Sequence, residues 1–598
     1  MSGGKRVVGI DLGTTHTALA WAELEGNNQV STELVAQLVS ASEVQARALL
    51  PSFVYFAHES EGALALPWDS ARRYAVGEYA RARGVEAPTR LVSSAKSWLS
   101  HPGIDRREGV LPLGAPDDID KISPVEASWH YLDHLGEAWS AANTGLLTEQ
   151  EIVITVPASF DAAARDLTVE AAYAAGLEDV SLLEEPQAAL YAWIEATGDA
   201  WRQHLTVGDV ILVLDIGGGT TDFSAIVVRE REDALELCRV AVGDHILLGG
   251  DNMDLALAHV LKAKLARSGS ELDRWQMTAL THGCRQAKER ILSDPHVAEV
   301  PIAVPSRGSQ LLGGSIRCEL TRAEVEQTLV EGFFPAVPIS AKPRARPRSA
   351  LTQVGLPYAA DAAITRHLAS FLTRQAGAAS RDDSPALLRP TQILFNGGVL
   401  KSTALRERLL TVIAGWLDAE GLPAPQVLPG EDLDLAVARG AAYYGLVRRG
   451  RGLRIRGGTA RAYYVGVESP APAVPGVEPP ISALCVAPFG LEEGTEAKLP
   501  PHELGVVVGE PVRFRFFGSS VRRDDAAGTQ LESWTPEQLE ELAPIEVTLP
   551  AEGREEGDVV SVRLRASITS VGTLLLEAEP LEPLTEDERW KVELSVRG

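Results

Sequence analysis

Cysteine, long apolar runs and positive charge are all scarce in this chain of 598 residues. The four cysteines are widely scattered, which excludes a disulfide framework and any metal-ligand spacing of thiols. No uninterrupted apolar stretch approaches the length that a membrane helix needs, and the first apolar run, Val7 to Ile10, is too short for a signal peptide. Asp and Glu number 82 against 56 Lys and Arg, so the net charge of -26 opposes general binding to nucleic acid or anionic membranes. We therefore expect a cytoplasmic protein with reduced thiols.

The apolar residues that are present are sufficient for at least two domains. Hydrophobic residues make up 45% of the sequence, and the chain exceeds the roughly 250 to 300 residues that one hydrophobic core supports. Up to about Arg449, β-branched runs alternate with Ala-rich amphipathic stretches, which predicts an α/β fold with buried sheets. Beyond an Arg and Gly-rich segment, segments of period two take over and indicate a β domain. We predict an α/β domain over residues 1–448, a linker over 449–458 and a β domain over 459–598.

A strand, a tight turn and a second strand are predicted around Asp11, Gly13, Thr14 and Thr15. Gly13 permits a turn conformation that other residues avoid, and it lets backbone N–H groups approach an anion closely. Thr14 and Thr15 add hydroxyl donors, and Asp11 at the end of the strand can hold water on a divalent cation. The pattern predicts a phosphate-binding turn, and the alternative for this segment alone is a plain β-hairpin.

The pattern recurs after the apolar run Val210 to Leu214, which weakens the hairpin alternative. The residues of this second turn are Asp215, Gly217, Gly218, Gly219, Thr220 and Asp222. Three successive glycines cost backbone entropy that a purely structural turn would not need, so close approach to a ligand explains them better. No Gly-Lys-Ser/Thr opens a helix after either turn, which excludes a Walker A loop. We predict two facing β-turns that hold nucleotide phosphates.

A third turn, Gly397 and Gly398, follows the predicted strand Gln392 to Phe395 and precedes the helical stretch Thr403 to Leu417. A simple strand-to-helix turn would explain this glycine pair, and so would contact with a flat nucleotide base. The order of the three turns resembles the actin, sugar-kinase and heat shock protein 70 superfamily. Further segments resemble the heat shock protein 70 (DnaK-like) branch, namely Val156 to Asp161, Leu183 to Ala189, Leu248 to Asn252 and Ala287 to Ser293. The resemblance covers nearly all of residues 5–447.

The resemblance implies an actin-like two-lobe ATPase with a duplicated ribonuclease-H-like core, followed by a small β-sandwich domain. It implies ATP or ADP as the ligand, magnesium (Mg2+) as the cofactor, and slow hydrolysis of ATP. Asp11, Glu185 and Asp215 would hold magnesium through water, and Asp222 would place the attacking water. Lys96 falls where the family has its catalytic lysine, which would offset the charge that develops on the γ-phosphate. The implied nucleotide contacts are Asp11, Gly13, Thr14, Thr15, Gly217, Gly218, Gly219, Thr220, Gly249, Gly250, Lys288, Gly397 and Gly398.

Two of these residues have structural alternatives. Lys96 could be a solvated lysine on a helix. Glu185 precedes Pro186 in the first turn of a predicted helix, where an acidic residue is explained by capping alone.

The chain also departs from the family pattern. Arg285 and Glu289 replace the acid and the base that flank the Ala-Lys pair of the family's adenosine-contacting helix, and Val399 and Lys401 replace a usual Ser and Arg. Adenine preference is therefore less secure than phosphate binding. The segment Arg449 to Arg456 replaces a short apolar and acidic linker. This argues against the usual docking of J-domain co-chaperones, which are implied partners together with nucleotide-exchange co-chaperones.

In the β domain, apolar and basic residues alternate over Val512 to Phe516 and Val562 to Ala566. One sheet face should be buried while the other displays arginines, which predicts a two-layer β-sandwich. The segment from Val562 to Val596 resembles the end of the family's peptide-binding β subdomain, which a helical lid follows there. No lid can be built before Gly598, so we expect a lidless variant. It would bind extended apolar peptide weakly with rapid exchange, or bind a dedicated protein partner on the arginine-bearing face. The alternative is a domain that only buttresses the ATPase lobes.

The first functional hypothesis is an ATP-dependent molecular chaperone that couples nucleotide state to the binding of unfolded polypeptide or a dedicated protein partner. The second is a small-molecule kinase of the same superfamily, which needs a carboxylate base such as Asp222 near the γ-phosphate. Lys96 and the β domain argue against that kinase, and the β domain argues against an actin-like filament protein. A nucleotide-gated scaffold with low turnover stays open beside the chaperone.

Overall fold

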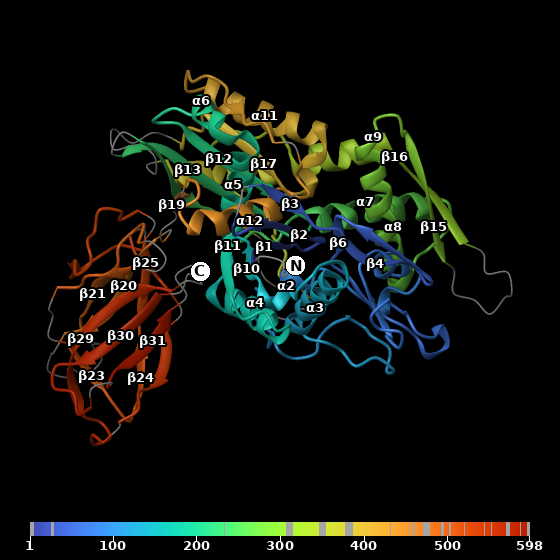
Figure 1. The fold of residues 1–598 in the computed structure, drawn as a ribbon. Coiled ribbons are helices and arrows are strands. Elements are labelled where there is room, and N and C mark those ends of the chain that lie inside the picture. The colour runs from blue at the N-terminus through green and yellow to red at the C-terminus, as the bar shows by residue number, and fades with distance from the viewer. Residues whose placement is uncertain are drawn as a thin grey trace. The chain divides into compact units, whose positions relative to one another are not determined.

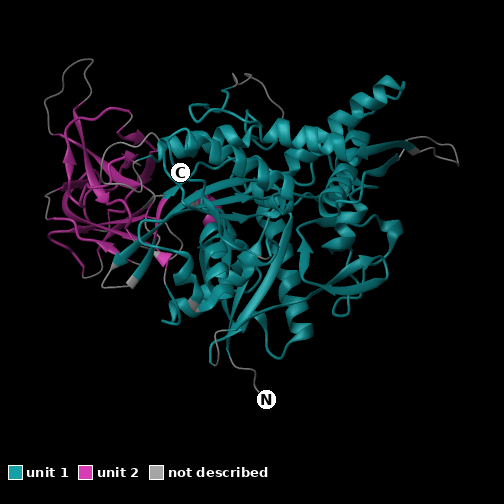
Figure 2. Ribbon diagram, turned by 90° about the horizontal axis from the view of Figure 1, so that it is seen from above, with its two compact units in different colours: residues 1–158, 167–237, 241–454 teal, residues 159–166, 238–240, 455–598 magenta. Residues whose placement is uncertain are grey.

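The computed structural model describes residues 5–25, 29–231, 234–305, 315–345, 355–376, 387–430, 432–453, 455–456, 459, 461–469, 479–491, 495–500, 504–519, 521–536, 538–542, 544–551, 553–569, 574–585 and 588–594. The chain divides into two compact units, which Figure 2 shows in different colours. Unit 1 comprises residues 1–158, 167–237 and 241–454, and unit 2 comprises residues 159–166, 238–240 and 455–598. The domain limits drawn from the sequence at residues 448 and 459 stay predictions.

The first sheet of unit 1 contains both strands predicted around the first turn. Its strand order is β11-β10-β1-β2-β3, with β6 also paired to β2. The bounds are β1 Arg6–Leu12, β2 His16–Glu23, β3 Val30–Thr32, β6 Leu49–Pro51, β10 Glu151–Val156 and β11 Val180–Glu184. β1 lies parallel to β10 and antiparallel to β2, so the turn at Gly13 follows directly from the end of β1.

The second sheet repeats the plan of the first. Its central strands follow the order β18-β17-β12-β13, with bounds β12 Val210–Ile216, β13 Thr221–Arg231, β17 Gln392–Asn396 and β18 Gln426–Val427. β12 is antiparallel to β13 and parallel to β17, just as β1 is to β2 and β10. We call the β1 sheet with the chain from β1 to β11 the first lobe, and the β12 sheet with the chain from β12 to β18 the second lobe. This duplication confirms the predicted actin-like fold.

Two helices, α5 (Glu185–Thr197) and α12 (Ala436–Arg448), pack against each other next to β1 (Figure 1). A Cβ on Gly440 of α12 would stand 1.7 Å from the carbonyl oxygen of Ala188 in α5. A Cβ on Gly9 of β1 would stand 2.3 Å from the carbonyl oxygen of Ala438. Because backbone meets backbone here, the relative positions of β1 and α5, which carry Asp11 and Glu185, are tightly fixed.

The remaining elements before residue 454 extend the two lobes. The helices are α1 Glu78–Arg83, α2 Ala95–Trp98, α3 Pro124–Ala142, α4 Ala162–Ala174, α6 Trp201–His204, α7 Gly250–Arg267, α8 Arg274–Ser293, α9 Arg322–Glu326, α10 Ile364–Arg374 and α11 Thr403–Asp418. The strands are β4 Val35–Ser40, β5 Glu43–Arg47, β7 Val54–Phe56, β8 Tyr74–Val76, β9 Leu91–Val92, β14 Ala234–Val242, β15 Glu299–Pro305 and β16 Ser315–Thr321. α11 confirms the helix predicted after the glycine pair. Across the described part of the chain, no helix has both the length and the apolar character needed to cross a bilayer.

Unit 2 consists mainly of strands in two layers around one core. One sheet has the order β26-β21-β20-β25-β27, and the other has the order β22-β29-β30-β31 with β23 paired to β29. The core takes Tyr463 and Phe516 from the first sheet and Val562 and Leu576 from the second, which confirms the predicted β-sandwich. The bounds are β20 Ala462–Glu468, β21 Ile481–Ala487, β22 Glu496–Ala497, β23 Leu504–Val507, β24 Pro511–Phe514, β25 Phe516–Ser519, β26 Gln530–Leu531, β27 Glu540–Glu541, β28 Ile545–Thr548, β29 Val559–Ile568, β30 Leu574–Pro580 and β31 Trp590–Leu594.

The alternating segment Val512 to Phe516 does not form one continuous strand, because the chain changes sheets at Arg515. β24 pairs with β28, whereas β25 pairs with β20 in the larger sheet. The period-two pattern continues through Arg515, so the sequence alone gave no sign of the break. The guanidinium of Arg515 instead donates to the carboxylate of Glu541 at 2.7 Å.

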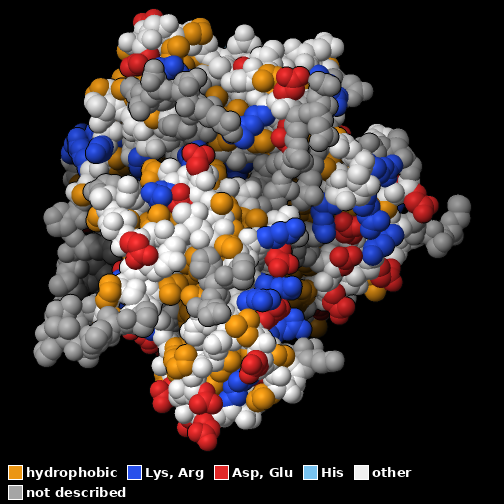
Figure 3. Space-filling model, turned by 90° about the vertical axis from the view of Figure 1, so that its left-hand side faces the viewer, with side chains coloured by type: hydrophobic (Ala, Val, Ile, Leu, Met, Phe, Trp, Pro, Cys, Tyr) orange, Lys and Arg blue, Asp and Glu red, His pale blue; other side chains and the backbone are white. Residues whose placement is uncertain are grey.

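The prediction that the second sheet face displays arginines holds at Arg513 of β24, which is exposed between the half-buried Val512 and Phe514, and it also holds for β29. There Arg563 and Arg565 are exposed between the buried Val562 and Ala566. In the β20 sheet the second face carries its own apolar cluster, formed by Ala462, Tyr464, Ala483, Cys485, Phe517 and Leu539. Trp534 packs on this cluster with its ring centroid 5.1 Å from that of Phe517. On the face in Figure 3, Lys and Arg side chains lie beside Asp and Glu side chains rather than in one basic patch.

Candidate functional site

A cavity of about 610 Å³ in unit 1 brings the three predicted turns together. Its volume is in the range that binds small molecules and cofactors. The predicted residues that line it are Asp11, Gly13, Thr14, Thr15, Lys96, Glu185, Asp215, Gly217, Gly218, Thr220, Gly250, Lys288, Gly397 and Gly398. The residues come from both lobes, so the cavity exists only where the lobes meet.

The glycines of the second turn let the two predicted phosphate-binding turns approach each other. A Cβ on Gly218 would stand 1.8 Å from the Oγ1 of Thr15 in the first turn. A Cβ on Gly219 would stand 2.5 Å from the Oγ of Ser97 and 2.8 Å from the Cγ2 of Thr14. The sequence explained these glycines by close approach to a ligand. The structure adds a second reason, because first-lobe side chains already fill the space that a Cβ would need.

Three of the predicted residues, Gly219, Asp222 and Gly249, adjoin the cavity without lining it. Asp222 on β13 lies directly opposite Asp215 on β12 and is 3% exposed. A Cβ on Gly249 would stand 2.6 Å from the carbonyl oxygen of Gly217, so this glycine supports the second turn from outside.

The carboxylates of Asp11, Glu185 and Asp215 share the cavity, and the charge of Glu185 disfavours the ionised form of the other two. Burial, together with the charge of Glu185, raises the pKa of Asp11 from 3.8 to about 7. Burial raises the pKa of Glu185, although the neighbouring Lys96 lowers it. Burial and the charges of Glu185 and Asp222 hold the pKa of Asp215 well above its usual range. A cation among these carboxylates would relieve this repulsion, so their chemistry fits magnesium.

Asn396, at the end of β17, was not predicted from the sequence. It lies opposite Asp215 in the parallel pairing, and its Nδ2 donates to Asp215 Oδ2 at 2.8 Å. Its Oδ1 is buried and has no hydrogen-bond partner among the described residues, which fits a site that holds a hydrated ion. Within the same described residues, no three His, Cys, Asp or Glu side chains are arranged to ligate a metal directly. The prediction was that the carboxylates would hold magnesium through water, so that observation does not test it.

Lys96, on α2, is not a solvated helix lysine, because its side chain is only 6% exposed. Its Nζ forms an ion pair with the carboxylate of Glu185, the first residue of α5. That carboxylate is therefore engaged with Lys96 inside the cavity, which the capping alternative does not explain.

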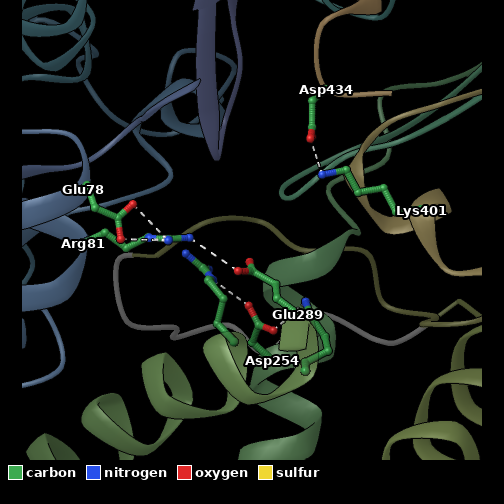
Figure 4. A network of polar contacts seen from close by, with 8 residues as sticks. Glu78, Arg81, Asp254, Glu289, Lys401 and Asp434 are labelled. Carbon is green, nitrogen blue, oxygen red and sulfur yellow. Dashed lines mark hydrogen bonds and ion pairs between the residues drawn. The ribbon is translucent and has the colours of Figure 1, made fainter. Parts of the chain in front are cut away.

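An ion pair connects the lobes across the part of the cavity lined by α1 and α8 (Figure 4). The guanidinium of Arg81 on α1 pairs with Glu78 at 3.0 Å and reaches Glu289 on α8 at 3.4 Å. His16 also lines this cavity, and burial together with the charge of Arg81 lowers its pKa to about 3. The imidazole of His16 is therefore neutral at physiological pH.

Arg285, the departure from the family pattern, is bound by acidic residues of α7. Its Nε donates to Asp254 at 2.7 Å and its Nη2 donates to Asp251 at 2.5 Å. Lys288 also reaches Asp254, with its Nζ 2.6 Å from Oδ1. The charge of Arg285 is thus balanced by carboxylates of the protein itself.

Several residues that line the cavity were missed from the sequence, namely His16, Arg81, Asp251, Asp254, Asn396 and Asp434. The sequence could have indicated Asp251 and Asp254, because they follow Gly250 at a spacing of three residues, which places both on one face of a helix. Asp434 pairs with Lys401, the residue noted near the family's usual arginine. Arg81 gave no signal, because its partner Glu289 lies far away in the sequence.

Comparison with known proteins agrees with this geometry. A family model described as "Hsp70 protein" matches residues 7–340. The chaperone protein HscA of Cronobacter sakazakii is 35% identical over 310 residues, which are 49% of this chain and 43% of that protein. The HscA homolog of Methylococcus capsulatus is 34% identical over 336 residues, 54% of this chain and 48% of its own length. The chaperone protein DnaK of Thermotoga petrophila is 29% identical over 333 residues, which are 54% of this chain and 48% of that protein. The chain spans less than half the length of these relatives.

Proposed function

Because the chain belongs to the Hsp70 family, we propose that it is an ATP-dependent molecular chaperone-like protein that binds and hydrolyses ATP with magnesium. It would couple nucleotide state to the binding of unfolded polypeptide or a dedicated protein partner. The observation that carries the proposal is the single cavity that joins two phosphate turns, Lys96 and three carboxylates. The chaperone names of the relatives point the same way.

The nucleotide would lie between the lobes, with its phosphates at the two turns. Thr14, Thr15 and Thr220 would donate hydroxyl hydrogen bonds to phosphate oxygens, as their positions on the cavity wall allow. Gly397 and Gly398 would leave room for the base. Lys288, held by Asp254 beside Gly250, would contact the sugar end of the nucleotide.

Asp11, Glu185 and Asp215 would hold magnesium through water molecules. The ion, when bound, supplies positive charge that lowers the barrier to cleavage of the γ-phosphate. The three carboxylates would hold the ion's water molecules, and Asn396 orients Asp215 through its 2.8 Å hydrogen bond.

Lys96 would stabilise the charge that develops as the bond to the γ-phosphate breaks. Its ion pair with Glu185 holds the ammonium group inside the cavity rather than in solvent. Asp222 would act on the attacking water from its position opposite Asp215. We expect slow turnover, in keeping with a switch rather than a metabolic enzyme.

Unit 2 would supply the surface for polypeptide or partner. Its exposed arginines on β29 would suit a partner with acidic groups, and weak, rapidly exchanging contacts with extended apolar segments are the second mode. A purely supporting role for this unit is the competing explanation.

The decisive experiment is ATP turnover by the purified protein with and without an unfolded polypeptide. A rate that rises with polypeptide supports the chaperone. A measurable rate that polypeptide leaves unchanged would favour a nucleotide-gated scaffold, and transfer of phosphate to a sugar would establish the kinase instead. Failure to bind ATP would overturn the proposal.

A further inference from the structure

Asp251, near the start of α7, contacts three different parts of the cavity wall. Its backbone N–H donates to the carbonyl oxygen of Gly218 in the second phosphate turn at 2.7 Å. Its Oδ1 accepts a hydrogen bond from Arg285 of α8 at 2.5 Å, and its Oδ2 accepts one from the hydroxyl of Ser94. Its side chain is 11% exposed, so these contacts are shielded from solvent.

Ser94 has an unusual backbone, with φ 54° and ψ 28° in the left-handed region. A residue with a Cβ pays a free-energy cost in this conformation, which persists only where the surroundings enforce it. Ser94 directly precedes α2, yet its side chain makes no capping bond to that helix and bonds Asp251 instead. Its carbonyl oxygen accepts from the N–H of Ser97 at 3.1 Å, so the direction of α2 depends on the conformation of Ser94.

Lys96 is the second residue of α2 and therefore follows any rotation of that short helix. Ser94 belongs to the first lobe and Asp251 to the second, so their hydrogen bond can form only when the lobes are together. Arg285 pairs with both Asp251 and Asp254, which fixes the carboxylate of Asp251 and balances its charge. The ring of Phe53 in the first lobe lies 5.5 Å from the guanidinium carbon of Arg285, which adds a further contact between the lobes.

We propose that Asp251 is a positioning residue that holds Ser94, and through it the Lys96 helix, in register with the second phosphate turn. The proposal rests on the nucleotide function given above and extends it. Closure of the lobes completes the hydrogen bond between Asp251 and Ser94, and this bond sets Lys96 in its working position. Nucleotide binding and the alignment of Lys96 are thereby linked through one side chain.

The test compares Asp251→Asn, Ser94→Ala and the double variant in the full-length protein. Each single variant should slow single-turnover phosphate release at least about tenfold, because small displacements of a catalytic group cost large factors in rate. ATP affinity should stay within about threefold of wild type, because the change acts on alignment rather than on binding. The double variant should be no slower than the slower single variant, since both changes remove the same hydrogen bond.

A second measurement needs no ATP hydrolysis. Hydrogen–deuterium exchange at the amides of Ser97 and Leu99, which donate within this turn, should be faster in both single variants without nucleotide. Ser94→Gly separates strain from bonding, because glycine adopts the left-handed conformation freely but lacks the hydroxyl. It should slow phosphate release as Ser94→Ala does.

Matched controls are Asp179→Asn, in an exposed ion pair with Lys5, and Ser140→Ala, at an exposed position on α3. Both should behave as wild type. Wild-type rates in the Asp251 and Ser94 variants, multiplicative losses in the double variant, or unchanged exchange at Ser97 and Leu99 would each overturn the positioning role. Absence of ATP binding by the wild type would overturn the proposed function instead, and exchange at Ser97 would still report whether Asp251 holds this segment.

Discussion

Lys96 and Glu185 form an ion pair inside the cavity, with side chains only 6% and 13% exposed. The two residues come from different elements of the chain, α2 and α5. Burial raises the pKa of Glu185, and the charge of Lys96 works against that rise. The ammonium group therefore lies beside carboxylates in the cavity. The positive charge would suit the phosphates of a nucleotide, and the negative charges would suit a magnesium ion.

Lys96→Ala should abolish turnover while leaving ATP affinity within about threefold, because the lysine acts mainly on charge that develops in the transition state. Phosphate release under single-turnover conditions and equilibrium binding of ATP are the two measurements. Equal phosphate release by Lys96→Ala and wild type would remove the lysine from the mechanism. Asp215→Ala is the contrasting change, because it should weaken magnesium-dependent binding itself.

Asp11 should release a proton when magnesium and nucleotide bind near neutral pH. Its pKa, raised to about 7, leaves a substantial fraction of the molecules protonated near neutral pH, and a nearby cation favours the ionised form. Calorimetric titrations at pH 7 in buffers of different ionisation enthalpy should show net release of protons on nucleotide binding, to which Asp11 contributes at most the fraction of a proton that it carries at that pH. Asp11→Asn should lower the number of protons released, and an unchanged number would mean that Asp11 keeps its proton or never had it.

The raised pKa of Asp11 also has a consequence for stability without ligand. The pKa of Asp11 is near 3.8 in the unfolded chain and about 7 in the folded protein, so between these pH values the folded state binds more protons than the unfolded state. The contribution of Asp11 to the free energy of unfolding is therefore fully present at low pH and is lost as the pH rises through the folded pKa. The free energy of unfolding of wild type minus that of Asp11→Asn should therefore fall between pH 5 and pH 8. Urea unfolding at several pH values measures this difference, and a difference that rises with pH would contradict it.

Closure of the lobes on nucleotide should make the protein more resistant to protease. Each lobe supplies one phosphate turn, and Arg81 already reaches Glu289 across the cavity at 3.4 Å. Digestion should slow at saturating ATP with magnesium compared with protein alone. An identical digestion pattern under both conditions would argue against a two-lobe site.

Gly440→Ala should destabilise the protein strongly, by roughly 3 kcal/mol or more, because the new Cβ would stand 1.7 Å from a backbone oxygen of α5. Gly415→Ala on α11 is the matched control, since no heavy atom beyond its chain neighbours and the backbone of its own helix lies within 4 Å of its Cβ position. That change should stabilise by about 0.5 to 1 kcal/mol, the helix preference for Ala. Urea unfolding of both variants gives the comparison, and equal stability of the two would refute the packing argument.

Deleting residues 459–598 tests the β-rich unit. If this unit binds polypeptide or a partner, the truncated protein should lose suppression of model-substrate aggregation and partner capture while it still binds ATP. Retained ATP binding shows that the rest of the chain has folded. Unchanged suppression and unchanged capture would rule out a binding role and leave the unit as a support for the ATPase lobes.

The two glycine-containing turns that line the cavity could be predicted because their signal is local. An apolar run that ends in Asp, followed by Gly and Thr, identifies a buried strand and its turn within about ten residues, and β1, β2, β12 and β13 confirm it. The break at Arg515 could not be predicted, because alternation of apolar and basic residues continues across it while the chain changes sheets. The alternation of apolar and basic residues indicates which side chains share one face of a strand, but it does not indicate which other strand pairs with it.

By itself, the sequence determined the turn residues, the two sheets that carry them and the β-rich character of the C-terminal part, because each depends on the periodicity of neighbouring residues. Only the tertiary structure decided that Ser94 bonds Asp251, that Arg285 is held by Asp251 and Asp254, and that Thr15 fills the space beside Gly218. These contacts join residues far apart in the chain. They exist because the packing of α5, α12 and β1 sets how closely the two lobes approach, and that distance is a property of the whole fold.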